Sequence, residues 1–200
     1  MPPHLPRLVV ASSNPGKLRE LERLLGGFAV EIIPQSALGI DGAAETEASF
    51  EGNALLKARH AARCAGSAAL ADDSGLEVDA LGGRPGVYSA RYAGEQASAV
   101  DNNALLLREL AGHPEPRRAR YRCVIAFVRD AEDPAPVIAS GSWEGCIARE
   151  PRGSGGFGYD PLFIVGDGTE TAAELPLELK NRISHRALAL GELLRRLGAA

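Results

Sequence analysis

The chain has 200 residues, of which 45% are apolar and 24% charged, with a formal net charge of −4. This length suits one domain with a substantial core, so we expect residues 1–200 to form a single domain. The acidic balance argues against a general nucleic-acid-binding protein, which needs a basic face. No apolar run is long enough to span a membrane. Three widely spaced cysteines fit neither a disulfide framework nor a zinc site, which favours the reducing cytoplasm.

Lysine is rare in this chain. The basic residues are almost all arginine, and lysine occurs only at positions 17, 57 and 180. A lysine against such a background can mark a site that requires a compact ammonium group rather than a planar guanidinium. Chance explains the same distribution, so the lysines become informative only where they fall in motifs.

The N-terminal segment predicts a strand, a polar turn and a helix. Residues 8–11 indicate a short buried strand, and leucines at helical spacing follow residues 12–17, which read Ser-Ser-Asn-Pro-Gly-Lys. Asn14 is a good N-cap, and Pro15 fits the first helical position. Free N–H groups at a helix start attract anions, and Lys17 adds a positive charge. We favour phosphate binding over a plain strand-helix connection.

An acidic loop precedes a second predicted helix. Residues 30–33 are typical of a strand, and the helix is expected from about Ser49 to Ala65. Asn53 and Lys57 are four residues apart and share one face of that helix. In the loop, Glu45 or Glu47 could supply an oxygen ligand to a divalent cation. The alternative is that these acids stabilise the helix dipole.

Two adjacent carboxylates follow an apolar run in residues 69–76, which read Ala-Leu-Ala-Asp-Asp-Ser-Gly-Leu. Neighbouring strand residues point to opposite faces, so Asp72 and Asp73 cannot both be solvated if this strand is central. A buried carboxylate pair is costly without a metal or another cation. Ligands of open α/β sheets bind at strand ends. The alternative is a turn that ends the strand, because Asp, Ser and Gly are common turn formers.

The second half of the chain is rich in β-formers. Residues 121–128 and 137–147 predict an antiparallel hairpin. In residues 157–160, Phe-Gly-Tyr-Asp, glycine beside aromatic residues allows a flat ring to approach the backbone, as base stacking requires. A turn with core aromatics is the alternative. Ser184 is a natural N-cap, which puts His185 and Arg186 at a helix start, where cations are unfavourable unless an anion or a carbonyl-rich ligand is present.

Phosphates, a divalent metal and a planar ring together account for these features, and a nucleoside triphosphate with Mg²⁺ is the simplest such ligand. Five motifs stand in the order seen in the inosine triphosphate pyrophosphatase family, which the chain resembles from about Leu8 to Leu197: Ser12-Ser-Asn-Pro-Gly-Lys17, Phe50-Glu-Gly-Asn-Ala54, Ala71-Asp-Asp-Ser-Gly-Leu76, Phe157-Gly-Tyr-Asp-Pro161 and Ser184-His-Arg186. Each motif alone is weak, and five in register are highly specific.

This resemblance implies an α/β fold, with an elongated mixed β-sheet flanked by helices, in two lobes with the active-site cleft between them. It implies hydrolysis of the non-standard purine nucleotides dITP, ITP and XTP to the monophosphate and pyrophosphate, with Mg²⁺ as cofactor. The expected partners are these small molecules and a second copy of the chain in a homodimer, without nucleic acid or membrane. A pyrophosphatase for modified or pyrimidine nucleotides is the alternative enzyme. A catalytically silent nucleotide-binding module is a further alternative, which the paired acids disfavour.

The resemblance also implies roles for individual residues. Asp73 is expected to be the general base and a metal ligand, with Glu45 preferred over Glu47 as the second ligand. The loop reads Ala43-Ala44-Glu45-Thr46-Glu47, whereas related proteins have two adjacent acids before the threonine. An arginine aimed at O6, such as Arg186, would select a 6-oxo purine over adenine. The expected substrate-binding residues are Ser12, Ser13, Asn14, Pro15, Gly16, Lys17, Ser74, Phe157, Gly158, Tyr159, Asp160, Lys180, His185 and Arg186.

Overall fold

The computed structural model describes residues 7–26 and 31–198. Its helices and strands follow in chain order: β1 (Arg7–Val10), α1 (Pro15–Leu25), β2 (Glu31–Pro34), η1 (Gln35–Leu38), α2 (Phe50–Ala65), β3 (Ala69–Val78), η2 (Asp79–Leu81), η3 (Gly86–Arg91), α3 (Ala99–Glu109), β4 (Arg118–Val128), β5 (Val137–Ile147), β6 (Phe163–Val165), α4 (Leu177–Ile183) and α5 (His185–Arg196). The η elements are short 3₁₀-helices. None of the described helices combines the length and apolarity needed to cross a bilayer. Residue 30 of the second predicted strand lies outside the described residues.

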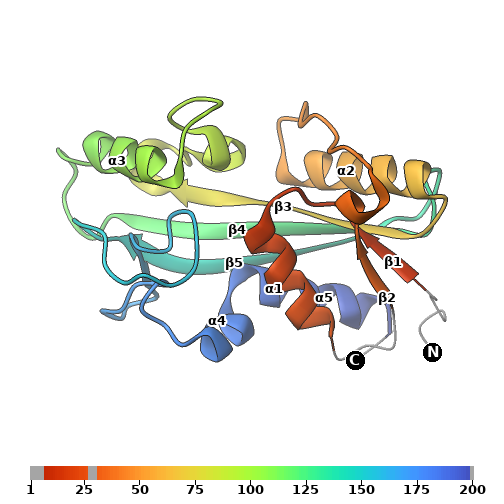
Figure 1. The fold of residues 1–200 in the computed structure, drawn as a ribbon. Coiled ribbons are helices and arrows are strands. Elements are labelled where there is room, and N and C mark those ends of the chain that lie inside the picture. The colour runs from red at the N-terminus through yellow and green to blue at the C-terminus, as the bar shows by residue number, and fades with distance from the viewer. Residues whose placement is uncertain (1–6, 27–30, 199–200) are drawn as a thin grey trace. The chain divides into compact units, whose positions relative to one another are not determined.

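The described strands form one mixed sheet in the order β2-β1-β3-β4-β5-β6. Strand β1 pairs in parallel with β2 and β3, whereas β5 and β6 are antiparallel. Strands β4 and β5 are neighbours joined by a short loop, as the predicted antiparallel hairpin requires. Helices flank the sheet, which confirms the predicted α/β class (Figure 1).

The chain divides into two compact units, and β3, β4 and β5 contribute residues to both. Unit 1 comprises the described parts of residues 1–73, 123–141 and 186–200. Unit 2 comprises residues 74–122 and 142–185. The prediction of a single domain stays a prediction.

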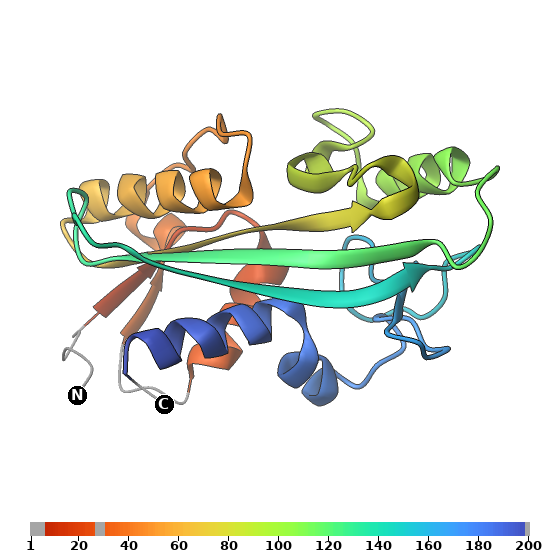
Figure 2. The same ribbon diagram turned by 180° about the vertical axis from the view of Figure 1, so that it is seen from behind.

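Unit 1 has two cores, one on each face of its strands. Alternate residues of β1 and β3, such as Val10 and Leu70, pack with α1 and α5, whereas Val9 and Ala69 pack against the alanines of α2. Figures 1 and 2 show α2 on one face of these strands and α1 and α5 on the other. Because side chains alternate along a strand, two neighbouring residues of β3 reach two different helix layers.

Unit 2 has a single core that is rich in aromatic rings. Leu106 of α3 packs with Leu76 of β3, and Tyr121, Trp143 and Phe163 cluster between the strands. Ring centroids of Tyr121 and Phe163 lie 4.6 Å apart. This core places the aromatic residues of β4 and β5 beside the segment that contains residues 157–160.

The predicted cap of the first helix and the predicted bounds of the second are confirmed. Asn14 caps α1 with its side chain, and Pro15 is the first helical residue. Ser49 caps α2, which ends at Gly66 in the left-handed region with φ of 59°. Ser98 opens α3 with a capping box. The short helix α4 was not predicted, and Ser184 follows its last residue directly before α5.

The turn predicted as an alternative at residues 72–75 is wrong, and the acids do not end the strand. Strand β3 runs without interruption from Ala69 to Val78, so Asp72 and Asp73 lie in its middle. Turn-forming residues continue the strand here because each carboxylate finds charged partners on its own face of the sheet. Tertiary contacts therefore override the local preference for a turn.

Candidate active site

Asp72 and Asp73 are both buried in β3, with 1% and 4% of their surfaces exposed. They follow the alternation of the strand. Asp72 meets Lys17 at the start of α1 and Arg186 at the start of α5, whereas Asp73 meets Lys57 of α2. The expectation that buried acids need cations is confirmed for both, and each acid has its own set.

Asp72 belongs to a charged network buried on the α1 and α5 face. Its Oδ2 accepts hydrogen bonds from Arg186 Nη2 at 3.1 Å and Nε at 3.3 Å, and Lys17 Nζ lies 3.3 Å away. Arg186 also donates to Glu20, a buried acid of α1. Burial alone would raise the pKa of Asp72, but Lys17, Arg186 and Lys57 together hold it well below its ordinary value. Asp72 is therefore a permanent anion that holds two cations in place.

Asp73 lies in a separate cluster on the α2 face. Lys57 Nζ donates to Asp73 Oδ1 at 2.8 Å and to Glu45 Oε1 at 2.9 Å. Asn53 Nδ2 donates to the other oxygen, Asp73 Oδ2, at 3.3 Å. Both carboxylate oxygens are thus held by residues of one helix face, the face that the sequence predicted for Asn53 and Lys57.

The electrostatics of this cluster suit a base. Burial raises the pKa of Asp73, and Lys57 and Lys17 offset this only in part, so the pKa stays above its ordinary value. Burial lowers the pKa of Lys57, but Asp73, Asp72 and Glu45 outweigh it and the net shift is upward. A carboxylate with a raised pKa accepts a proton more readily, which is what general-base catalysis near neutral pH requires.

The oxygens of Asp73 and Glu45 converge on one small space, because a single ammonium group reaches both. Mg²⁺ is commonly bound by one or two carboxylates together with substrate phosphates, and this pair fits that donor set. Among the described residues, no three His, Cys, Asp or Glu side chains form a metal cage. Glu45 contacts Lys57 beside Asp73, whereas Glu47 is exposed, and the preference for Glu45 as the second ligand stays a prediction.

The start of α1 differs from its prediction in one respect. Its first N–H groups were expected to be free, but Asn14 Oδ1 accepts from Gly16 N at 2.8 Å and Lys17 N at 3.2 Å. Ser12 is buried and Ser13 is exposed. The Asn14 side chain satisfies the helix start in the protein alone, so the positive charge of this segment comes chiefly from Lys17.

In unit 2, Asp160 gathers several predicted residues around it. Asp160 Oδ2 accepts from Lys180 Nζ at 2.7 Å and from Phe157 N at 2.8 Å. Its Oδ1 accepts from Tyr121 OH at 3.2 Å. The ammonium of Lys180 lies 5.1 Å from the centre of the Phe157 ring. Gly156 has φ of 73°, and a Cβ there would lie 2.0 Å from Asp160 Oδ2, so only glycine fits.

His185 joins this group through an aromatic stack. Its ring lies 4.6 Å from that of Tyr121 with planes 9° apart. Tyr159, by contrast, is buried and donates its hydroxyl to Ser89 O at 2.8 Å. The structure thus brings Phe157, Asp160, Lys180 and His185 together within unit 2.

Two other predicted substrate residues are Arg186 and Ser74. Arg186 belongs to unit 1, where it is 1% exposed and bound to Asp72 and Glu20. Ser74 is partly exposed in β3 directly after the two acids. The structure places both residues without testing their contact with a substrate, so those roles stay predictions.

Several residues of these clusters were absent from the predicted site, among them Glu20, Lys57 and Tyr121. The scarcity of lysine was a usable signal, since each of the three lysines contacts an aspartate: Lys17 with Asp72, Lys57 with Asp73, and Lys180 with Asp160. No comparable signal marked Glu20 or Tyr121.

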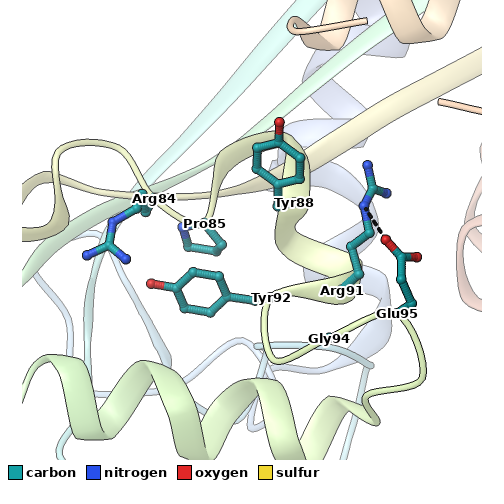
Figure 3. A pocket seen from close by; sticks show the side chains of 7 residues that line it. All are labelled: Arg84, Pro85, Tyr88, Arg91, Tyr92, Gly94 and Glu95. Carbon is teal, nitrogen blue, oxygen red and sulfur yellow. Dashed lines mark ion pairs between the residues drawn. The ribbon is translucent and has the colours of Figure 1, made fainter. Parts of the chain in front are cut away.

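A separate pocket of about 360 Å³ lies on unit 2 beside η3 (Figure 3). Its lining residues are Arg84, Pro85, Tyr88, Arg91, Tyr92, Gly94 and Glu95. Each arginine has an acidic partner, Glu109 at 3.0 Å for Arg84 and Glu95 at 3.5 Å for Arg91. The pocket contains no predicted site residue, and its charges balance.

Comparisons with known proteins identify the family of the chain. Residues 8–196 match the model of the Ham1 family. The chain belongs to the Ham1 family. A relative from Methylococcus capsulatus named dITP/XTP pyrophosphatase is 60% identical over 194 residues, which cover 96% of each chain.

Solved structures of Ham1 proteins agree with this fold. A HAM1 protein from Coxiella burnetii has a TM-score of 0.89 and 47% identity, covering 97% of this chain and 99% of its own. A nucleoside-triphosphatase / dITP/XTP pyrophosphatase from Mycobacterium abscessus has a TM-score of 0.75 and 45% identity, covering 94% and 98%. The family that the five motifs resemble is thereby confirmed.

Proposed function

We propose that this protein hydrolyses the non-standard purine nucleotides dITP, ITP and XTP to the nucleoside monophosphate and pyrophosphate, and so removes them from the nucleotide pool. The names of its full-length relatives support the substrate class. The observation that carries the chemistry is Asp73, a buried carboxylate with a raised pKa whose two oxygens are held by Lys57 and Asn53.

Asp73 is the general base of this proposal. Its carboxylate accepts the proton of a water molecule that attacks the phosphate chain, and Lys57 and Asn53 fix the direction in which the carboxylate faces. Asp73 and Glu45 would hold the proposed Mg²⁺, which when bound neutralises charge on the phosphate oxygens. Lys57 contacts both of these acids and so keeps their carboxylates close to each other.

Phosphate binding is assigned to residues 12–17, and Ser74 is proposed to contact a phosphate or a ribose hydroxyl of the substrate. Lys17 is the cation of this set, and Asp72 fixes the position of its ammonium group. Arg186 and Lys17 share Asp72, and Arg186 is also bonded to Glu20, so the formal charges of these four side chains cancel and the ammonium of Lys17, the partly exposed member, is the one able to meet an anion. A positive group held this rigidly costs little reorganisation when an anion binds.

Base binding is assigned to residues 157–160 together with Lys180, His185 and Arg186. The half-buried ring of Phe157 provides a flat face for stacking, and Asp160 holds Lys180 beside that ring. Arg186 is proposed as the donor to O6 of a 6-oxo purine, for which adenine offers an amine instead. We further propose that the enzyme is a cytoplasmic homodimer with no nucleic-acid or membrane partner.

The test is a panel of dITP, ITP, XTP, ATP, GTP and pyrimidine triphosphates with Mg²⁺, with kcat/KM measured for each. The proposal predicts a strong preference for dITP, ITP and XTP over ATP, whose base carries an amine instead of an oxygen at C6. Equal rates on ATP and dITP would refute the substrate class, and a preference for pyrimidine nucleotides would favour the alternative enzyme. Omission of Mg²⁺ should abolish turnover, and full activity in a chelator would remove the cofactor assignment.

A further inference from the structure

Two consecutive asparagines near the start of α3, Asn102 and Asn103, are both buried, but their side-chain amides differ in how many hydrogen bonds they make. Asn102 satisfies both ends of its amide, because its Oδ1 accepts from Ala93 N at 2.8 Å and its Nδ2 donates to Ala90 O at 3.1 Å. Asn103 donates from Nδ2 to Gly158 O at 3.1 Å. Within the described part of the chain, its Oδ1 is buried without a hydrogen-bond partner. Asn103 therefore makes one bond and leaves one acceptor unsatisfied.

Stability alone does not account for Asn103. A buried acceptor without a partner costs at least as much as one ordinary hydrogen bond contributes. The orientation of the amide is also determined, since only the NH₂ end can donate to the Gly158 carbonyl. An apolar side chain would avoid the unpaired oxygen, so the useful property of Asn103 is its donor to Gly158.

Gly158 lies in the base-framing segment, which we define as residues 157–160. As a glycine, it has a wider choice of backbone conformations than its neighbours. Its φ is 62°, a left-handed conformation that glycine adopts and leaves without steric cost. The neighbouring residues are anchored elsewhere: Tyr159 by its hydroxyl to Ser89 O, and Asp160 by Tyr121 and Lys180. Among the described residues, Asn103 is the recorded partner of the Gly158 carbonyl.

The carbonyl that Asn103 holds belongs to the peptide between Gly158 and Tyr159, one residue after Phe157. Freeing that carbonyl would let the ψ angle of Gly158 change, which shifts the chain on the Phe157 side relative to the anchored Tyr159, although the bond from Phe157 N to Asp160 would remain. Asn103 thus supplies the third anchor of a four-residue segment, from a helix that contributes no predicted substrate contact.

We propose that Asn103 is a positioning residue for base recognition, which holds the Gly158 peptide so that the Phe157 ring keeps a fixed place. This inference rests on the proposed function, because it assigns the base to the segment that Asn103 anchors. Asn103 does not touch the substrate in this account. Its loss should weaken binding of the base while the chemistry at Asp73 continues.

The test compares Asn103→Ala with Asn102→Ala, a control on the same helix turn that breaks two hydrogen bonds to residues 90 and 93 instead. For ITP, Asn103→Ala should raise KM about tenfold, the worth of one hydrogen bond, with kcat unchanged within about twofold. The melting temperature should fall more in Asn102→Ala, while KM for ITP stays near the wild-type value. Asn103→Asp, which keeps the shape but lacks the donor, should raise KM at least as much, and Asn103→Ala decides the outcome if that variant does not fold.

Two results would overturn the inference. An unchanged KM in Asn103→Ala shows that the anchor does not affect base binding. Equal increases of KM in Asn103→Ala and Asn102→Ala show general loosening of unit 2 rather than positioning. The wild-type protein separates this test from the proposed function: if it neither hydrolyses ITP nor binds IMP by calorimetry, the proposed function fails, whereas wild-type activity with an unaltered Asn103→Ala refutes this inference alone.

Discussion

Replacing Lys57 with methionine should destabilise the fold, because Lys57 is the cation that neutralises the buried Asp73 on the α2 face. Lys57 donates to Asp73 at 2.8 Å and to Glu45 at 2.9 Å, and its side chain is 12% exposed. Methionine matches its length and packing but removes the charge. Asp73 would then be a buried carboxylate without its main cation, a loss that costs about 3–5 kcal/mol when one partner of a buried pair is removed.

The cost should depend on pH in a defined direction. The folded pKa of Asp73 is already above its unfolded value because of burial. For such a group, ionisation destabilises the fold, so its contribution worsens as pH rises through the folded pKa. Without Lys57 that pKa rises further. The difference in unfolding free energy between wild type and Lys57→Met should therefore be larger at pH 8 than at pH 5, where a protonated Asp73 is neutral.

Urea denaturation of both proteins at several pH values measures this difference. The double variant Lys57→Met/Asp73→Asn is the matched control, because it removes the cation and the charge that needs it. At pH 8, its loss of unfolding free energy relative to the wild type should be clearly smaller than the sum of the losses in the two single variants. Additive effects, or a cost of Lys57→Met below about 1 kcal/mol at every pH, would refute the claim that Lys57 neutralises Asp73.

Two further predictions concern the acid and the segment beside Asp160. Because Asp73 must be ionised to act as the base, kcat/KM for dITP should fall at low pH as its carboxylate becomes protonated; a profile that stays flat through the whole carboxyl range would contradict this. Gly156→Ala places a methyl group 2.0 Å from Asp160 Oδ2, at a backbone φ of 73° that disfavours alanine. This variant should have a lower melting temperature and a higher KM for ITP. The control is Gly191→Ala on α5, where the added methyl group meets no atom within 4 Å. A Gly156→Ala protein with unchanged stability and KM would show that Asp160 can move freely.

The local elements could be predicted from the sequence because their signals are local. The cap at Asn14 and the second helix, expected from about Ser49 to Ala65 and found from Phe50 to Ala65, depend on residues that are close together along the chain. The geometry of a strand, in which neighbouring side chains point to opposite faces, also predicted that Asp72 and Asp73 would face opposite ways.

Long-range contacts explain what the sequence did not reveal. Strand β3 continues through residues that favour a turn because its acids meet Lys17, Lys57 and Arg186, which lie far away along the chain. Tyr121 was missed because its hydroxyl meets Asp160, 39 residues later, and a core tyrosine looks the same in sequence whatever its hydroxyl binds. The rarity of lysine drew attention to positions 17, 57 and 180, but their aspartate partners became known only from the structure.

The most direct test of the account is the product released from dITP by the wild-type protein and by Asp73→Asn. With Mg²⁺ present, the wild type should release pyrophosphate and dIMP in equal amounts, without orthophosphate as a primary product. Asp73→Asn should remain folded, with a cooperative melting transition, and should show no turnover. Orthophosphate as the first product of the wild type, or near-normal turnover by Asp73→Asn, would contradict the proposed reaction or the role of Asp73 as its base.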